Sequence, residues 1–158
     1  MRIRPATEKD AGTSFMLLEP GERTTTVEEE REQLRRFAAA GNRVALVAEE
    51  NGRLAGLLEV PGGRFRRERH TAYLVPGVLW EHSGKGIGRA LLESAERRAS
   101  EHGILRLELT VMWNNQAKIH LYRKSGFETE GTRRRALRVH GSLVDELYMA
   151  KLLPTPGT

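Results

Sequence analysis

The sequence predicts a single domain of mixed α/β class, with one sheet that is antiparallel at both ends and parallel in the middle. Three observations lead to this prediction. The dipeptide Asn51-Gly52, a strong hairpin signal, joins two apolar segments. A strand–helix–strand unit, which should cross over right-handed into a parallel pair, runs from about residue 71 to residue 111. A second hairpin, turning at residues 140–142, closes the chain.

The elements of the first half follow from caps and apolar runs. Thr7 and Asp10 have the spacing of a helix cap, and Thr26–Glu29 forms a capping box for a second helix that Gly41 ends. The run 44–48 is apolar on both faces, as in a strand covered on both sides. The predicted elements are a strand at 2–4 stopped by Pro5, a helix from near Ala11, a helix at 27–40, and strands at 44–48 and 53–60.

In the second half, apolar residues at helical spacing, Leu91, Leu92, Ala95 and Ala99, mark a helix that His102-Gly103 stops. Alternating residues mark the strands on either side of it. The predicted elements are strands at 71–79 and 105–111, helices at 86–102 and 115–125, and strands at 130–139 and 143–152. The whole chain therefore holds about seven strands and four helices.

Composition bounds the function. The 158 residues, 39% hydrophobic and 30% charged, fit one globular domain, expected over residues 1–153 with a flexible tail at 154–158. No apolar run approaches the roughly 20 residues that span a bilayer, and the N-terminus lacks a signal-peptide core, so we expect a cytoplasmic protein with no membrane partner. Since the chain has no cysteine and no short histidine pairing, we expect no disulfide, no cysteine nucleophile and no metal.

The net charge of +5 is consistent with an anionic ligand and does not require nucleic acid. Arginines cluster at 64–69 and at Arg133–Arg135. We expect these runs to be solvated edges of hairpins. The functional alternative is a basic rim that steers phosphates. RNA binding is more remote, because the arginine runs lack a regular pattern of interleaved aromatic residues.

Two local features indicate a ligand site. Pro76-Gly77 lies inside an apolar strand, where it either makes a strain-relieving bulge or splays the strand from its parallel neighbour and frees backbone groups for an extended ligand. The glycines at 84, 86 and 88 run into a helix start, where free N–H groups favour phosphate. A Walker A loop would need glycine at Leu79, and the glycine spacing does not fit a dinucleotide fingerprint.

Two motifs in this order resemble the GNAT family of N-acetyltransferases. Residues 78–92 resemble its acyl-CoA motif, with Gly86 and Gly88 at the fixed glycine positions. Residues 115–127 resemble its second motif, and the order of strands and helices agrees along essentially the whole chain. The sequence departs from the family at Ser83, where Arg or Gln is usual, and at Trp80, where proline is common. The loss of a charge at Ser83 should weaken pyrophosphate binding without abolishing it.

The resemblance implies the GNAT fold: a central mixed, mostly antiparallel sheet with a splayed parallel pair. It also implies acetyl-CoA as cosubstrate. The backbone of Pro76, Gly77 and Val78 would pair with the pantetheine arm, and an N–H near Val78 would face the thioester carbonyl as an oxyanion donor. Asn115 would contact the cofactor or simply cap its helix, and one residue can do both. The pyrophosphate would be cradled at Ser83, Gly84, Lys85, Gly86, Ile87, Gly88 and Arg89.

The catalytic residues are also implied by resemblance. Tyr122 would serve as general acid to the departing thiolate and contact the cofactor, and the alternative is a core tyrosine packed against Phe127. The base is open. Thr110 stands where related enzymes place a carboxylate, and Glu108 projects from the same strand face. Glu81 is a second candidate, a water relay is a third, and either carboxylate is alternatively a surface or ion-paired group.

The expected reaction is direct acetyl transfer to a primary amine of a small molecule, amino acid or peptide N-terminus, because no cysteine is present and Ser83 lacks a triad context. Residues 134–150 resemble the closing hairpin of small-molecule bacterial members. Activity should rise with pH, since the reaction needs a neutral amine. The alternative is a non-catalytic acetyl-CoA-binding or regulatory module. A homodimer is possible.

Overall fold

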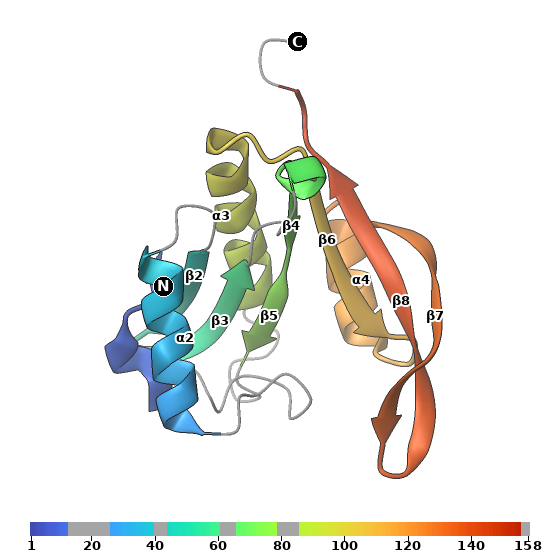
Figure 1. Ribbon diagram of the computed structural model, residues 1–158, viewed down its shortest axis with the longest axis horizontal. Coiled ribbons are helices and arrows are strands. Elements are labelled where there is room, and N and C mark those ends of the chain that lie inside the picture. Colours follow the sequence, from blue (N-terminus) through green and yellow to red (C-terminus); the bar gives the residue numbers. More distant parts are fainter. Residues whose placement is uncertain (13–25, 40–43, 61–65, 79–85, 156–158) are drawn as a thin grey trace.

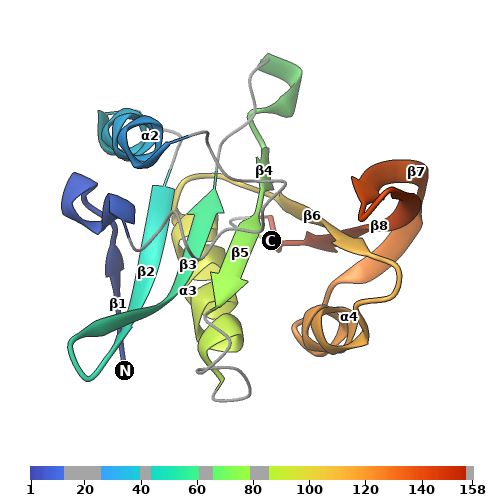
Figure 2. The same ribbon diagram turned by 90° about the horizontal axis from the view of Figure 1, so that it is seen from below.

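The computed structural model describes residues 1–12, 26–39, 44–60, 66–78 and 86–155, and these form two four-stranded sheets with helices on both faces (Figures 1 and 2). The first sheet has the order β1-β2-β3-β5 and is antiparallel throughout. Its strands are β1 (Arg2–Pro5), β2 (Val44–Glu50), β3 (Arg53–Val60) and β5 (Val75–Val78).

The second sheet has the order β4-β6-β8-β7, and only its β4–β6 pair is parallel. Its strands are β4 (Thr71–Tyr73), β6 (Arg106–Met112), β7 (Glu128–Val139) and β8 (Ser142–Leu152). Both predicted hairpin turns are confirmed: Asn51-Gly52 and His140-Gly141 each place two successive residues at positive φ, as a two-residue turn requires.

Three α-helices are described: α2 (Val27–Ala39), α3 (Ile87–Glu101) and α4 (Gln116–Lys124). Figure 2 shows α2 on one face of the sheets and α3 and α4 on the other. The largest apolar core lies on the α3 side, where Leu46 and Leu58 of the first sheet and Leu107 and Leu109 of the second pack with the buried stripe of α3. Alternate residues of β2 and β3, Val47 and Leu57, pack on the α2 side, so these strands are covered on both faces as predicted.

The number of strands differs by one from the predicted number. The strand expected at 71–79 is two strands, β4 and β5, which lie in different sheets and are separated by Leu74. The described residues therefore hold eight strands instead of seven. Of the four predicted helices, the one expected from near Ala11 runs into residues 13–25, outside the described ranges; before it, Glu8–Asp10 forms the short 3-10 helix η1, and Arg66–Glu68 forms a second, η2.

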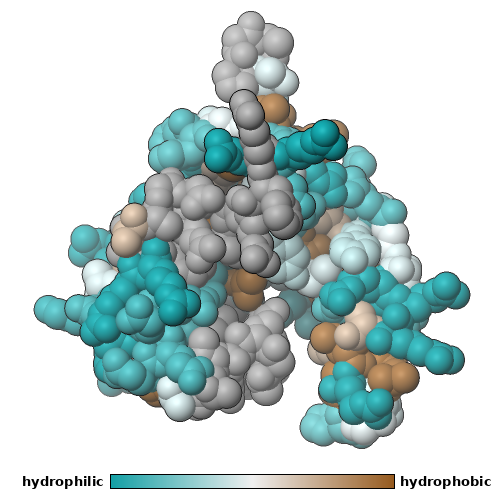
Figure 3. Space-filling model, viewed as in Figure 1, coloured by the Kyte–Doolittle hydropathy of each residue, from teal (hydrophilic) through white to brown (hydrophobic). Residues whose placement is uncertain are grey.

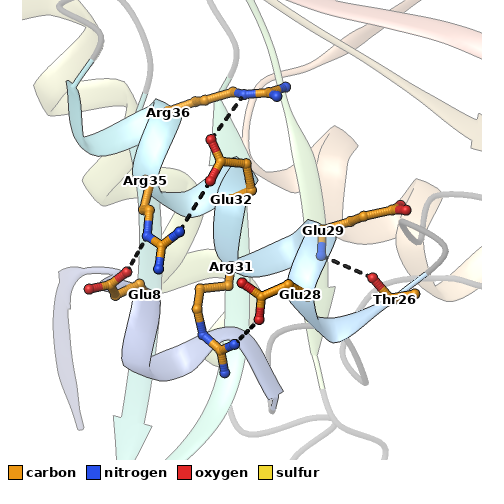
Figure 4. A network of polar contacts seen from close by, with 8 residues as sticks. All are labelled: Glu8, Thr26, Glu28, Glu29, Arg31, Glu32, Arg35 and Arg36. Carbon is orange, nitrogen blue, oxygen red and sulfur yellow. Dashed lines mark hydrogen bonds and ion pairs between the residues drawn. The ribbon is translucent and has the colours of Figure 1, made fainter.

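The exposed face of α2 carries ion pairs that also fix η1 (Figure 4). Arg35 contacts Glu8 of η1 and Glu32 one turn back on α2, and Thr26 Oγ1 accepts from the N–H of Glu29 at 3.1 Å, as the capping box predicts. Each exposed pair is worth only about 0.2–1 kcal/mol, so burial of the opposite face stabilises the helix more. No helix within the described ranges is long and apolar enough to cross a membrane.

The β7–β8 hairpin extends beyond the body as an arm (Figures 1 and 3). Its arginines behave as predicted for a hairpin edge. Arg134 and Arg135 are exposed, and Arg133 pairs with Glu146 of β8 at 2.9 Å. In the space-filling view the surface is hollowed between this arm and the part of the molecule that carries α2 (Figure 3).

Candidate active site

The two sheets part at one point, between β5 and β6. Parallel pairing of β4 with β6 ends at Tyr73–Glu108, and the N–H of Leu74 donates the last bond to the carbonyl of Glu108 at 2.9 Å. Beyond it, β5 pairs with β3 while β6 pairs with β8 (Figure 1). The strands are therefore splayed from Val75 and Leu109 onward, which confirms the interpretation of Pro76-Gly77 as a place where two parallel neighbours separate.

The backbone groups of Pro76 and Val78 point into this gap. Backbone N–H and C=O groups of successive strand residues alternate between the two sides, and Leu74 faces β6. Pro76 and Val78 share its side, whereas Val75 and Gly77 face β3. Pro76, which has no N–H, thus occupies a position where no ladder partner needs one. The gap offers the carbonyl of Pro76 and the N–H of Val78 to an extended ligand.

The start of α3 supplies a second set of donors. Gly86 is the N-cap residue, with φ +78° and ψ 11°, a left-handed conformation that favours glycine. The first amide bonded within the helix is that of Ala90, which donates to the carbonyl of Gly86 at 3.0 Å. The amides of Ile87, Gly88 and Arg89 therefore have no acceptor inside α3. The side chain of Ile87 is buried in the core and fixes this helix end in place.

Helix α4 bears the two remaining predicted residues. Asn115 is its N-cap, and its side-chain oxygen accepts from the N–H of Lys118 at 3.2 Å, which confirms the capping role. Tyr122 is only 2% exposed, and its ring packs against Phe127 at 6.1 Å between centroids with a 57° tilt. The contact with Phe127 foreseen as the alternative is thus present, and the roles of Asn115 and Tyr122 toward a cofactor stay predictions.

The candidate base Glu108 lies at the closed end of the gap, on the face opposite α3 and α4. Its Oε2 accepts from Nε of Arg106 at 3.0 Å, so it is an ion-paired carboxylate with 40% of its side chain exposed. Thr110, the next residue on that face, shares a 2.6 Å hydrogen bond with the hydroxyl of Tyr73. The structure therefore places Glu108 beside the gap, but its carboxylate is already paired with the guanidinium of Arg106.

Tyr73, Arg106, Glu130 and Tyr148 also line this region, and the sequence patterns did not single them out. Tyr73 is in register with Glu108, and Tyr148 with Thr110. The alternating exposure of β6 would have placed Arg106 with Glu108, but no spacing rule relates Glu130 or Tyr148 to them, because they reach the site from other strands. Four predicted residues, Glu81, Ser83, Gly84 and Lys85, lie outside the described ranges.

A family model and the relatives of similar sequence indicate the same family. Residues 13–127 match the model of the "Acetyltransferase (GNAT) family". The L-amino acid N-acetyltransferase AaaT of Escherichia coli is 33% identical over 108 residues, which cover 68% of this chain and 67% of the relative. An acetyltransferase of Yersinia pestis is 36% identical over 87 residues, 55% of this chain and 59% of the relative. The matched region thus spans about three-fifths to two-thirds of these relatives.

Solved structures share the fold over nearly the whole chain. A ribosomal-protein-alanine N-acetyltransferase from Brucella melitensis has a TM-score of 0.89 at 29% identity and covers 97% of this chain and 100% of its own. The protein yncA from Salmonella typhimurium, solved with its cofactor acetyl-CoA, has a TM-score of 0.89 at 23% identity and covers 100% of this chain and 96% of its own. At 23% identity the likeness to yncA concerns the fold.

Proposed function

The chain belongs to the acetyltransferase (GNAT) family, an acetyl-CoA-dependent family of transferases, and we propose that it moves the acetyl group directly onto the primary amine of a small molecule. The observation that carries the proposal is the splayed pair β5 and β6, which leaves backbone groups of β5 facing the gap. The start of α3 adds the amides at 87–89, which have no acceptor within the helix.

The residues around the gap fit acetyl-CoA. The carbonyl of Pro76 and the N–H of Val78 match the amide groups of an extended pantetheine arm, as an added strand would. The amides at 87–89 and the positive end of α3 favour the pyrophosphate. Gly86 leaves space beside them, because no atom of the described residues lies within 4 Å of the position of an added Cβ. Bound there, acetyl-CoA supplies a thioester that is already activated toward an amine.

The proposed transfer needs one proton acceptor and one donor. A C–N bond forms as the C–S bond breaks, one proton leaves the amine, and one proton ends on the sulfur. We assign the donor role to the phenol of Tyr122, and the acceptor role to Glu108, to Glu81 or to a water between them and the amine. The N–H of Val78 would stabilise negative charge on the carbonyl oxygen as it develops. Asn115 would contact the cofactor while capping α4.

An amino acid is the first acceptor to test, because the relative AaaT is an L-amino acid N-acetyltransferase. The Brucella melitensis structure, a ribosomal-protein-alanine N-acetyltransferase, makes a protein N-terminus the comparison acceptor. We also keep as proposals the single domain at 1–153 and a cytoplasmic location. A homodimer is a further proposal, which size-exclusion chromatography with light scattering would test.

The function is tested by adding acetyl-CoA and then amines. Ligand at about 100 times its dissociation constant should add roughly 2.7 kcal/mol to the free energy of unfolding, seen as a rise in Tm. Thiol release should then follow with a subset of an amine and amino acid panel. A rise in Tm without thiol release from any amine would favour the non-catalytic module, and no rise at millimolar acetyl-CoA would contradict both.

Replacing Gly86 by alanine tests the helix start. Because Gly86 has φ +78°, the variant Gly86→Ala should lose about 1 kcal/mol of unfolding free energy through backbone strain. It should also lose about tenfold or more in acetyl-CoA affinity, since strain at the N-cap redirects the amides that follow. Calorimetric titration with acetyl-CoA measures the second effect.

Gly103→Ala is the matched control. Gly103 has φ +75°, equally open space around its Cβ position, and lies at the other end of α3. It should show the same loss of stability with unchanged acetyl-CoA affinity. Equal affinity losses in both variants would mean that Gly86 acts through general stability and not through the donors at 87–89.

A further inference from the structure

A pocket of about 310 Å³ opens beside the closed end of the gap. Residues 107, 109 and 111 of β6 are buried toward α3 and α4, so the alternate residues Arg106, Glu108 and Thr110 face the other side of the sheet. Tyr73 shares that face, because it contacts Thr110. The pocket thus lies on the face that carries α2, next to the point where the acetyl group would be presented to an acceptor.

Among the residues that the structure describes, the charged groups lining the pocket are one arginine and two glutamates. Arg106 donates through Nε to Glu108 at 3.0 Å, and its Nη2 and Nη1 donate to the two oxygens of Glu130 at 2.5 and 3.0 Å. The hydrogen bond with Glu130 raises the pKa of Arg106 and lowers the pKa of Glu130, so this forked pair stays ionised. The three groups sum to a formal charge of −1 in a chain whose net charge is +5.

This ion-pair set is held by the architecture of the sheet. Glu130 lies at an irregularity of β7 between Thr129 and Gly131, two strands away from Arg106. Between them on β8 lies Ala150, which is in register with Glu108 and is only 4% exposed. The Arg106 guanidinium and the Glu130 carboxylate therefore meet across β8, the strand that lies between theirs.

Two tyrosine side chains also line the pocket. Tyr73 and Tyr148 reach the pocket from β4 and β8, and Tyr148 is 48% exposed although it is large and apolar for most of its surface. The face of a tyrosine ring attracts cations through the negative charge of its π-electrons. A carboxylate ligand would meet two glutamates and an arginine that already uses three of its five N–H donors on them. The chemistry of the lining therefore favours a cation over an anion.

We propose that this pocket binds a second, non-reacting ammonium group of the acceptor, between Glu108 and Glu130 and against Tyr73 and Tyr148. The inference rests on the proposed function, because the acceptor's other amine then reaches the gap near Thr110. With Glu108 binding the non-reacting ammonium, the proton of the reacting amine goes to Glu81 or to a water. The favoured acceptors are diamines and basic amino acids, in which one amine stays protonated while the other, neutral, amine takes the acetyl group.

The test compares two ligands of equal chain length, 1,5-diaminopentane and 1-aminopentane, whose binding to the CoA-saturated protein is measured by calorimetry. The diamine should bind about three- to tenfold more tightly, the range expected for one cation at a partly exposed carboxylate site with aromatic walls. Glu130→Gln should reduce this ratio to near one. Glu101→Gln, at an exposed glutamate that ends α3 on the other face of the sheet, should leave the ratio unchanged.

Binding is measured apart from turnover so that the two proposals can fail separately. A diamine preference that Glu130→Gln removes supports the pocket even where neither amine releases thiol, in which case acetyl transfer to amines is what fails. Equal affinities for the two amines, or a preference that Glu101→Gln and Glu130→Gln reduce alike, would overturn the pocket assignment whatever the turnover. L-lysine and L-norleucine extend the same comparison to amino acids.

Discussion

Tyr122→Phe should keep the fold and the affinity for acetyl-CoA while kcat falls about a hundredfold or more, the usual worth of a positioned general acid. The phenol is 2% exposed and its ring packs on Phe127, so the substitution preserves the packing and removes only the hydroxyl. Loss of a buried hydroxyl should cost about 0.5–1.5 kcal/mol of stability, which leaves the protein folded. Steady-state thiol release and calorimetric titration with acetyl-CoA measure the two quantities.

Phe127→Leu is the control for packing. It disturbs the same ring contact and should lower the free energy of unfolding by more than Tyr122→Phe does, but it leaves the phenol in place. Its kcat should therefore stay within a few-fold of the unmodified protein. Full activity of Tyr122→Phe would remove the hydroxyl from the mechanism and leave Tyr122 as a core residue.

The second large effect is on stability, at a buried carboxyl under α2. Glu30 is 0% exposed, and neither of its side-chain oxygens has a hydrogen-bond donor within the described residues. Burial raises its pKa, and the neighbouring carboxyl of Glu59 opposes that rise. Glu59 is 4% exposed and accepts from Nε2 of Gln33 at 2.9 Å, so the two carboxyl groups are buried close to one another.

The sign of the pH dependence follows from that raised pKa. The folded chain holds the Glu30 proton more tightly than the unfolded chain does, so the stabilising contribution of this group is complete below its ordinary pKa. It is lost as the pH rises through the raised value. At neutral pH the protein either keeps a proton on Glu30 at a cost or buries a second negative charge beside Glu59.

Glu30→Gln should therefore stabilise the protein at pH 7 by about 1–3 kcal/mol, because an amide is neutral and can donate to Glu59. For a chain of this size that corresponds to a rise in Tm of roughly 2–10 °C. The gain should shrink toward pH 4, where the unmodified carboxyl is protonated anyway. Thermal unfolding at both pH values measures it.

Glu29→Gln, on the exposed face of α2, is the control and should change stability by less than about 0.5 kcal/mol. A loss of stability in Glu30→Gln at pH 7 would show that an ionised Glu30 is favourable where it lies. An equal gain at pH 4 and pH 7 would show that the proton on Glu30 is not what distinguishes the two side chains.

Local signals in the sequence predicted most of the fold. Asn51-Gly52, His140-Gly141 and the capping box at Thr26–Glu29 act through residues near in the chain, and all lie where their patterns predict. The gap was also foreseeable, since a proline inside an apolar strand requires a side without a ladder partner. What the pattern missed was that the strand divides at Leu74 and joins two sheets, because pairing partners are a property of the whole sheet.

The site is less readable from sequence where it depends on contacts across strands. The hydrogen bond of Tyr73 with Thr110 joins residues 37 positions apart, and the ion pair of Arg106 with Glu130 joins two strands that are not neighbours in the sheet. Glu30 follows three exposed residues of the first turn of α2, where acidic side chains are ordinary, and only the packing of α2 against the sheet buries it.

The most direct test is amide hydrogen exchange with and without saturating acetyl-CoA. Binding along the splayed strands should slow exchange at Val78 and at Ile87, Gly88 and Arg89, because these amides would gain acceptors from the ligand. The outer part of the β7–β8 hairpin, residues 134–145, should exchange at the same rate in both samples. Unchanged exchange at Val78 and at the start of α3, with acetyl-CoA shown to be bound by calorimetry, would contradict the placement of the ligand in this gap.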